Sequence, residues 1–339
     1  MSVSVTFGSP RDDALRATFA ALGELANGRP DADPVDGAVA LALAGPAGAP
    51  LARASLWLAN DLVGAPGRSG LVGHYEALEP EAGAALLRET LAELARRGAL
   101  RVLGPMNGGT WRRYRLELPR ASGDPDVRPD GFASEPRNPP RYNDDFLAAD
   151  LRVVARYESR YEPEPAVDPH VHDRARERAE SRGLRLHALD PASFDATLRQ
   201  MHALSLGAFA GNFYYGPLPL EDFVALYAPF RERAVPELVR LASDAQGRLA
   251  GYLFGFPDPL SAEHGRPTRT VCKTVAVATH ARGAGLGALL LDDFRAASLA
   301  FGARGILHAL MHMENPSMRM SARHHSVLFK RYALYGWTP

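Results

Sequence analysis

The chain has 339 residues, with 39 basic and 39 acidic side chains and a formal net charge of zero. A chain of this length favours two domains over one core, and the even charge balance argues against a nucleic-acid partner. No apolar stretch reaches the roughly 18 residues that a membrane span needs, and residues 1–10 do not resemble a signal peptide, so we expect a cytoplasmic protein with no membrane partner. The single cysteine, Cys272, excludes an internal disulfide and a multi-thiolate zinc site, and we expect it to be buried on a strand.

The first half predicts one strand–helix–strand unit. Residues 71–78 form the first predicted strand, residues 80–97 the helix and residues 99–104 the second strand. From 119 to 169 the periodicity fades and prolines cluster, which favours extended or turn backbone over helix. We place the domain boundary near the end of that segment, with domains at 1–165 and 166–339.

The second half carries a clearer pattern of elements. In order, it predicts a solvated helix at 172–183, a strand at 184–190, a helix from 191 to about 207, a hairpin with its turn at 244–247, and a long strand at 270–278.

A glycine-rich turn follows that long strand. Residues 279–291, THARGAGLGALLL, contain three glycines between the strand and a helix predicted from about Gly285 to Phe301. The first turn of a helix has unpaired amides and a partial positive charge, so it attracts phosphate groups. Gly283, Gly285 and Gly287 would leave those amides accessible, and Arg282 would add a positive charge. The spacing G-x-G-x-G differs from the G-x-G-x-x-G of a dinucleotide-binding turn.

The run from Arg282 to Gly287 resembles the R-x-x-G-x-G/A signature of the GCN5-related N-acetyltransferases (GNATs). The resemblance covers the chain from about Leu184 onward and implies a mixed-sheet α/β fold of the α+β type. It implies acetyl-CoA as cosubstrate, without a metal. The residues it assigns to coenzyme A are Val275, Ala276 and Val277 on the strand and Arg282, Gly283, Ala284, Gly285, Leu286 and Gly287 at the turn.

Residues 305–313 resemble the next strand of that family, which splays from its neighbour and opens a slot for the thioester. His312, near the end of this strand, could accept the proton of an incoming amine, or be a histidine of a partly polar core. Asn315 resembles the asparagine that binds the pantetheine arm, with Ser317 assisting, although Asn315 could equally cap a helix.

Two further groups of aromatic residues are candidates. Tyr332, four residues before Gly336, matches the spacing of the family's tyrosine general acid, but it lies farther along the chain than usual, and residues 326–337 could instead form a strand. Phe213, Tyr214 and Tyr215 lie where the family's acceptor loop occurs, so they could line the substrate pocket or pack against the core.

The first half resembles a degenerate copy of the same fold, because its helix begins at Pro80 and has no arginine–glycine turn. The sequence therefore predicts two tandem acyl-CoA N-acyltransferase (GNAT-like) domains, of which only the second binds coenzyme A. The expected activity is transfer of an acetyl group to an amine of a small molecule or peptide, by a monomer or homodimer. The alternatives are a noncatalytic coenzyme A sensor or scaffold and, against the neutral charge balance, an aminoacyl transferase using tRNA.

Overall fold

The computed structural model describes residues 3–27, 35–44, 48–283 and 285–339. The strands are β1 (Val3–Gly8), β2 (Ala38–Ala44), β3 (Pro50–Leu62), β4 (Ala65–Ala77), β5 (Arg101–Gly104), β6 (Leu116–Glu117), β7 (Arg152–Pro163), β8 (Arg185–Ala188), β9 (Val239–Ser243), β10 (Leu249–Pro257), β11 (Ala262–Glu263), β12 (Arg266–Pro267), β13 (Arg269–Val277), β14 (Gly305–His312) and β15 (Val327–Trp337). The α-helices are α1 (Asp13–Asn27), α2 (Pro80–Arg96), α3 (Tyr142–Ala148), α4 (Pro169–Glu180), α5 (Phe194–Ala208), α6 (Leu220–Tyr227), α7 (Leu286–Phe301) and α8 (Pro316–Ala322). No helix in these described ranges is both long and apolar enough to cross a membrane.

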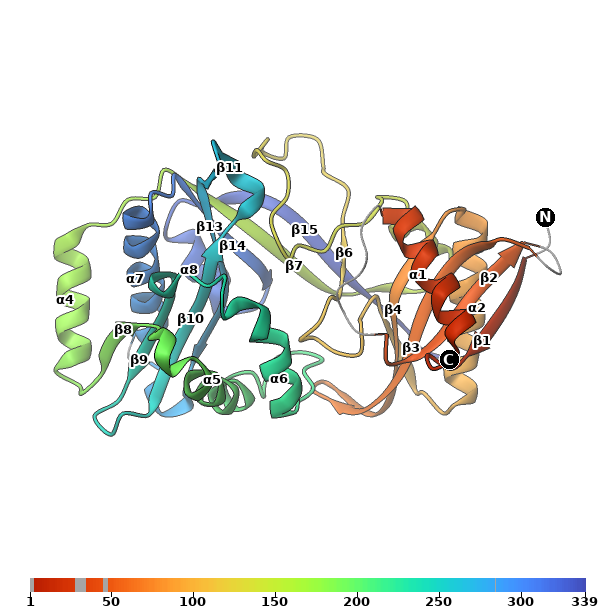
Figure 1. The fold of residues 1–339 in the computed structure, drawn as a ribbon, viewed down its shortest axis with the longest axis horizontal. Helices are drawn as coiled ribbons and strands as arrows, with labels where there is room; N and C mark the ends of the chain where they lie inside the picture. Colours follow the sequence, from red (N-terminus) through yellow and green to blue (C-terminus); the bar gives the residue numbers. More distant parts are fainter. Residues whose placement is uncertain (1–2, 28–34, 45–47, 284) are drawn as a thin grey trace.

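A mixed sheet runs through both halves of the molecule in the order β1-β2-β3-β4-β5-β15-β7-β14-β13-β10-β9-β8. In the first half, α2 and α3 cover one face of the sheet, and α1 covers the other. In the second half, α5 and α6 pack on one face, while α4 and α7 pack on the opposite face (Figure 1). Each half is therefore a three-layer arrangement with a core on both sides of the sheet.

Two strand–helix–strand units carry the predicted pattern. In the first half, β4 and β5 pair in parallel and α2 connects them, with the leucine stripe of α2 buried against the sheet. In the second half, β13 and β14 pair in parallel and α7 connects them. The prediction of both units is confirmed, as are the solvated helix α4, the β9–β10 hairpin and the burial of Cys272. The spacing of apolar residues predicts these helices and strands because each of them buries one apolar face against a neighbouring element.

The strand β7 was missed, as was the short helix α3, because the region from 119 to 169 was predicted to be extended or turn backbone. β7 lies before the predicted boundary at residue 165, yet it pairs with β14 and β15, which both lie after it. The last strand, β15, in turn pairs with β5 of the first half. Figure 1 shows β7 and β15 crossing between the two halves. The halves thus exchange strands, and the division at residue 165 stays a prediction.

A buried ion pair secures the exchanged strand β7. The Glu162 carboxylate accepts hydrogen bonds from Arg295 of α7, whose Nη2 lies 2.6 Å from Oε1. The His308 Nε2 lies 3.3 Å from the other oxygen of Glu162. Burial alone would raise the pKa of Glu162, but the hydrogen bonds and charges of His308 and Arg295 hold it below its usual value. Glu162 therefore joins β7 to α7, which begins at the glycine turn, and to β14.

We expect Glu162→Gln to lower the free energy of unfolding by about 1–3 kcal/mol, because it removes the buried counter-charge of Arg295 and leaves the more exposed Asp292 to pair with it. Glu164→Gln, at an exposed neighbouring position, is the matched control and is expected to change it by less than about 0.5 kcal/mol. Urea unfolding at pH 7 measures both. Equal stability of the two variants would show that the pair does not hold β7.

Candidate active site

The glycine-rich turn connects β13 to α7 in the second half. Gly283 and Gly285 have φ angles of 79° and 75°, in the left-handed region that favours glycine, and Gly285 is the N-cap of α7. Both residues are exposed. The described residues supply no hydrogen-bond acceptor to the amides of Gly283, Gly285, Leu286 or Gly287. These amides are thus available at the positive end of a helix.

The space in front of this turn fits a phosphate group. A Cβ built at Gly283 or Gly285 would meet no atom within 4 Å, whereas one at Gly287 would reach Val277 and Met320 at ordinary contact distances of 3.6 and 3.7 Å. The Arg282 guanidinium donates a hydrogen bond to the carbonyl of Ala208 at 2.9 Å, which joins the turn to the end of α5. Ala284, which was also assigned to coenzyme A, lies outside the described residues. The described part of the turn therefore leaves room for an anionic diphosphate, and the assignment of these residues to coenzyme A stays a prediction.

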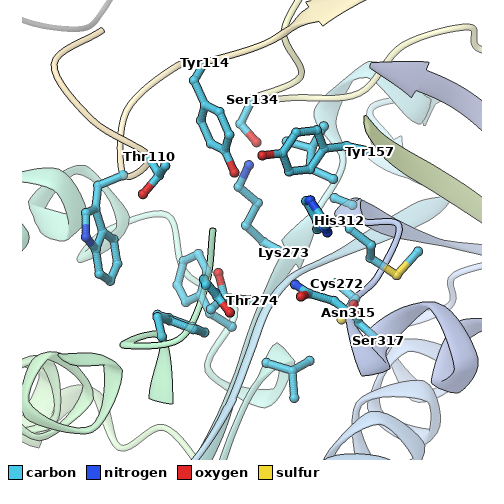
Figure 2. Close-up of a pocket in the computed structure, with 18 of the residues that line it drawn as sticks. Thr110, Tyr114, Ser134, Tyr157, Cys272, Lys273, Thr274, His312, Asn315 and Ser317 are labelled. Carbon is cyan, nitrogen blue, oxygen red and sulfur yellow. The ribbon is translucent and has the colours of Figure 1, made fainter. Parts of the chain in front are cut away.

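The strands β13 and β14 separate where the resemblance implied that they would. They pair only from Arg269 to Cys272, opposite Gly305 to His308. Beyond Cys272, β13 pairs with β10 alone, whereas β14 pairs with β7 from Gly305 to His312, with an irregularity between His308 and Met311. Between them opens a cavity of about 570 Å³ (Figure 2).

Residues from both halves of the chain line this cavity. The floor comes from β13 and β14, with Cys272 and Val275 among its residues. Phe213 and Tyr215 also line it, as predicted for an acceptor loop. Tyr214 does not, because its backbone pairs with Val63 and its ring packs in a cluster with residues of β4 and β5. Burial raises the pKa of Cys272 to about 12, so this thiol stays protonated at neutral pH.

His312 faces the cavity and stacks edge-on against Tyr157, with ring centroids 5.0 Å apart. Its Nδ1 accepts a hydrogen bond from the amide of Glu314 at 3.2 Å, so the neutral ring carries its proton on Nε2. Burial, partly opposed by the charge of Glu314, lowers the pKa of His312 below its usual value. In this geometry His312 is suited to donate a hydrogen bond rather than to accept a proton.

Asn315 and Ser317 also line the cavity, from the start of α8. Asn315 occupies the N-cap position of α8, but its side chain makes no capping hydrogen bond. The side-chain amide is therefore available to a ligand, which fits the role implied by the resemblance better than the capping role. Of the three β13 residues assigned to the pantetheine arm, Val275 lines the cavity, whereas Ala276 and Val277 do not; Ala276 is buried.

Tyr332 lies elsewhere and does not support the general-acid role. Residues 327–337 form the strand β15, and Tyr332 is fully buried in it. Its hydroxyl donates a hydrogen bond of 2.6 Å to Glu135, and burial raises its pKa well above the usual value. Tyr332 does not line the cavity, because β15 is separated from β14 by the exchanged strand β7.

Lys273 is the cavity residue that the sequence analysis missed. It lies on β13 at the first position after the pairing with β14 ends, and Figure 2 shows its amine pointing toward the hydroxyls of Tyr114 and Tyr157. Burial lowers the pKa of Lys273 to about 7, with the charge of Arg115 acting in the same direction. No carboxylate of the described residues pairs with it, whereas the amine of Lys330 lies 2.9 Å from Glu117. A signal existed, because the chain contains only two lysines against 37 arginines.

The loop after β5 in the first half forms the opposite wall of the cavity. Trp111, Tyr114 and Arg115 of this loop line the cavity. The Arg115 guanidinium lies between two rings, 3.7 Å from the centroid of Tyr114 and 4.0 Å from that of Tyr157. Sequence reasoning did not connect this loop with the site because its contacts with β13 and β14 are long-range.

Comparison with known proteins identifies the fold. No protein-family model and no curated protein matches the sequence. Solved structures match over nearly the whole chain: a GCN5-related N-acetyltransferase from Sphaerobacter thermophilus is 15% identical with a TM-score of 0.52, covering 99% of this chain and 95% of its own. A tandem GNAT protein from the clavulanic acid biosynthesis pathway is 14% identical with a TM-score of 0.53, covering 99% and 98%.

A third match is the GCN5-related glucosamine N-acetyltransferase region of a fungal multi-domain GH3 β-N-acetylglucosaminidase. It is 13% identical with a TM-score of 0.57, and the alignment covers 99% of this chain but only 38% of the fungal one. These likenesses define the class: the chain has the tandem GNAT fold, with a mixed sheet and a glycine turn at the helix of its second unit. At such low identity they show the fold alone.

Proposed function

We propose that this protein is an acyl-CoA-dependent N-acyltransferase, most simply an acetyltransferase, that acts in the second GNAT unit on an amine of a small molecule or peptide. The observation that supports the proposal most directly is the glycine turn with its accessible amides, which follows the part of β13 that no longer pairs with β14. The tandem GNAT fold supports it.

The residues for binding acetyl-CoA are present. The amides around Gly283 to Gly287 would hold the diphosphate, and the edge of β13 beyond Cys272 offers peptide groups to the pantetheine arm. Asn315 and Ser317 would add side-chain hydrogen bonds at the cavity. The corresponding helix of the first half, α2, has Glu79, Pro80 and Glu81 at its start, where negative charges would repel a phosphate. We therefore propose that only the second unit binds coenzyme A.

When bound, acetyl-CoA supplies an acyl group as a thioester, and its transfer to an amine forms an amide and releases the thiol. Lys273 is proposed to accept the proton that the amine loses, at Nζ, because a lysine with a pKa of about 7 is partly neutral at neutral pH. His312, with its proton on Nε2, would orient the acceptor by donating a hydrogen bond. The aromatic side chains around the cavity would exclude water from the amine.

Calorimetry with acetyl-CoA, followed by an assay of free thiol release over a panel of amines, tests this function. We expect one acetyl-CoA per chain to bind with a micromolar Kd and thiol to be released above background with at least one class of amine. Binding without turnover over the whole panel would favour the noncatalytic coenzyme A sensor. Absence of binding would contradict both functions.

A further inference from the structure

The charged side chains that line the cavity are all basic. The described residues that line the cavity include Arg112, Arg113, Arg115 and Lys273, and none of them is an aspartate or glutamate. Arg112 is paired outside the cavity with Asp36, whose carboxylate lies 2.8 Å from its Nη2. Arg115 and Lys273 give the cavity a positive potential, which attracts anions and opposes the binding of a further positive charge.

Arg115 is the most confined of these cations. It is only 5% exposed, and its Nη1 donates a hydrogen bond of 3.0 Å to the carbonyl of Leu310. Its Nε has no hydrogen-bond partner, and no carboxylate of the described residues lies within 4.0 Å of its guanidinium. A buried charge without a counter-ion is unfavourable unless a ligand supplies one.

The buried acid Glu135, which acts on the pKa of Lys273, does not serve as this counter-ion. The charge of Glu135 raises the pKa of Lys273. Its carboxylate, however, accepts a hydrogen bond from the hydroxyl of Tyr332 and lies 3.4 Å from the amine of Lys330. It does not line the cavity. Among the described residues, Arg115 is therefore left without a compensating carboxylate.

We infer that the acceptor is an amine that also carries an anionic group, a carboxylate or a phosphate, and that Arg115 binds this group. The inference rests on the proposed acyltransferase function and specifies its substrate class. A guanidinium held between Tyr114 and Tyr157 presents its donors in a fixed plane, the geometry that carboxylates and phosphates match.

The remaining lining residues indicate what the rest of the acceptor molecule is like. Apolar and aromatic side chains form most of the remaining wall, including Trp111, Phe213 and Phe254. A compound with an apolar or aromatic body, one amine and one anionic group, such as an aromatic amino acid or its phosphonate analogue, fits this wall. Polyamines and other polycations do not, because each additional positive charge would face Arg115 and Lys273.

Matched product analogues test the inference without requiring turnover. The probes are N-acetylphenylalanine, its neutral amide, and 1-acetamido-2-phenylethylphosphonic acid, titrated by calorimetry into the full chain in the absence of coenzyme A. We expect the wild type to bind at least one of the two acids roughly tenfold or more tightly than the amide, as a charge-assisted hydrogen bond predicts. The carboxylate and phosphonate arms distinguish the two anions.

The same titrations with variants assign the effect to Arg115. Arg115→Gln is expected to bind acid and amide equally, and Arg115→Lys to retain part of the preference. Arg112→Gln is the matched control, because Arg112 lies in the same loop but already pairs with Asp36, and it is expected to keep the full preference. The melting temperature of each variant reports whether it is folded.

Equal affinity of the wild type for the acids and the amide, or no binding of any acid, would overturn the inference. So would an unchanged preference in Arg115→Gln. Because the wild-type comparison needs no variant, a folding defect in Arg115→Gln leaves the test intact. Acetyl-CoA binding is measured on the same samples: its absence would refute the acyltransferase function, whereas equal binding of acid and amide by a protein that binds acetyl-CoA would refute only the anionic acceptor.

Discussion

Lys273→Met is expected to lower kcat by a factor of roughly 10²–10⁴, the usual contribution of a positioned general base. The variant keeps a side chain of similar length but cannot accept a proton. Its Kd for acetyl-CoA is expected to stay unchanged, because the proposed contacts with coenzyme A at the glycine turn and on β13 are made by backbone groups that the substitution keeps. Stopped assays of thiol release with a reactive amine, together with calorimetry, measure the two quantities.

The general-base role of Lys273 also predicts how the activity of the wild type changes with pH. Lys273 accepts a proton only when neutral, so kcat/KM should rise with pH and level off above the pKa of about 7 that burial produces. The charges of Arg113 and Arg115 lower this pKa and that of Glu135 raises it. If an anion binds Arg115, the positive potential falls, and the inflection of kcat should lie at higher pH than that of kcat/KM.

Lys273→Arg is the control for a purely electrostatic role. Arginine keeps the positive charge but does not lose its proton, so this variant should be nearly as slow as Lys273→Met. Near-normal activity in Lys273→Arg, or in Lys273→Met, would contradict the general-base role.

The stability of Lys273→Met shows whether a loss of activity comes from the missing base or from misfolding. The pKa of Lys273 is lower in the folded chain than the 10.5 of an ordinary lysine, so the unfolded chain binds more protons between about pH 7 and 10.5, and wild-type stability should rise through this window. Lys273→Met removes that dependence and should be at least as stable as the wild type below pH 7. Thermal unfolding at several pH values checks this.

Gly285→Glu is expected to weaken acetyl-CoA binding by roughly 100-fold or more, the equivalent of losing one or two hydrogen bonds to a charged group. The new side chain would enter the open space before the α7 N-terminus and place a negative charge where the diphosphate would bind. The φ angle of 75° adds backbone strain, so affinity must be compared in a variant with equal strain.

Gly302→Glu provides that comparison. Gly302 is the C-cap of the same helix, with a φ of 96° and no atom within 4 Å of a built Cβ. Both variants should lose similar stability, but only Gly285→Glu should lose acetyl-CoA binding by calorimetry. Equal affinities in the two variants would place coenzyme A elsewhere on the molecule.

Features encoded within short stretches of sequence were predictable. The unit β13–α7–β14 and the glycine turn follow from residues close together in the chain, because helix periodicity, strand alternation and the left-handed φ of glycine are local properties. The strand β7 was obscured by the prolines on both sides of it. Its alternating pattern, RVVARYESRYEP, was nevertheless present in the sequence.

Lys273 illustrates a signal that was present but not used. In a chain with 37 arginines and two lysines, a lysine inside an apolar strand occupies a position where the capacity to lose a proton distinguishes it from arginine. The pKa itself could not be predicted, because it depends on burial and on Arg115, which belongs to the other half of the chain.

The sequence by itself determined the GNAT-like order of elements and the left-handed backbone at Gly283 and Gly285, because both depend on the conformation of neighbouring residues. Only the tertiary structure decided that β7 separates β14 from β15, that Tyr332 is buried against Glu135, and that Lys273 and Arg115 meet at one cavity. These arrangements arise from strand pairing and packing between distant segments, where each segment has several possible partners and only the complete fold selects one.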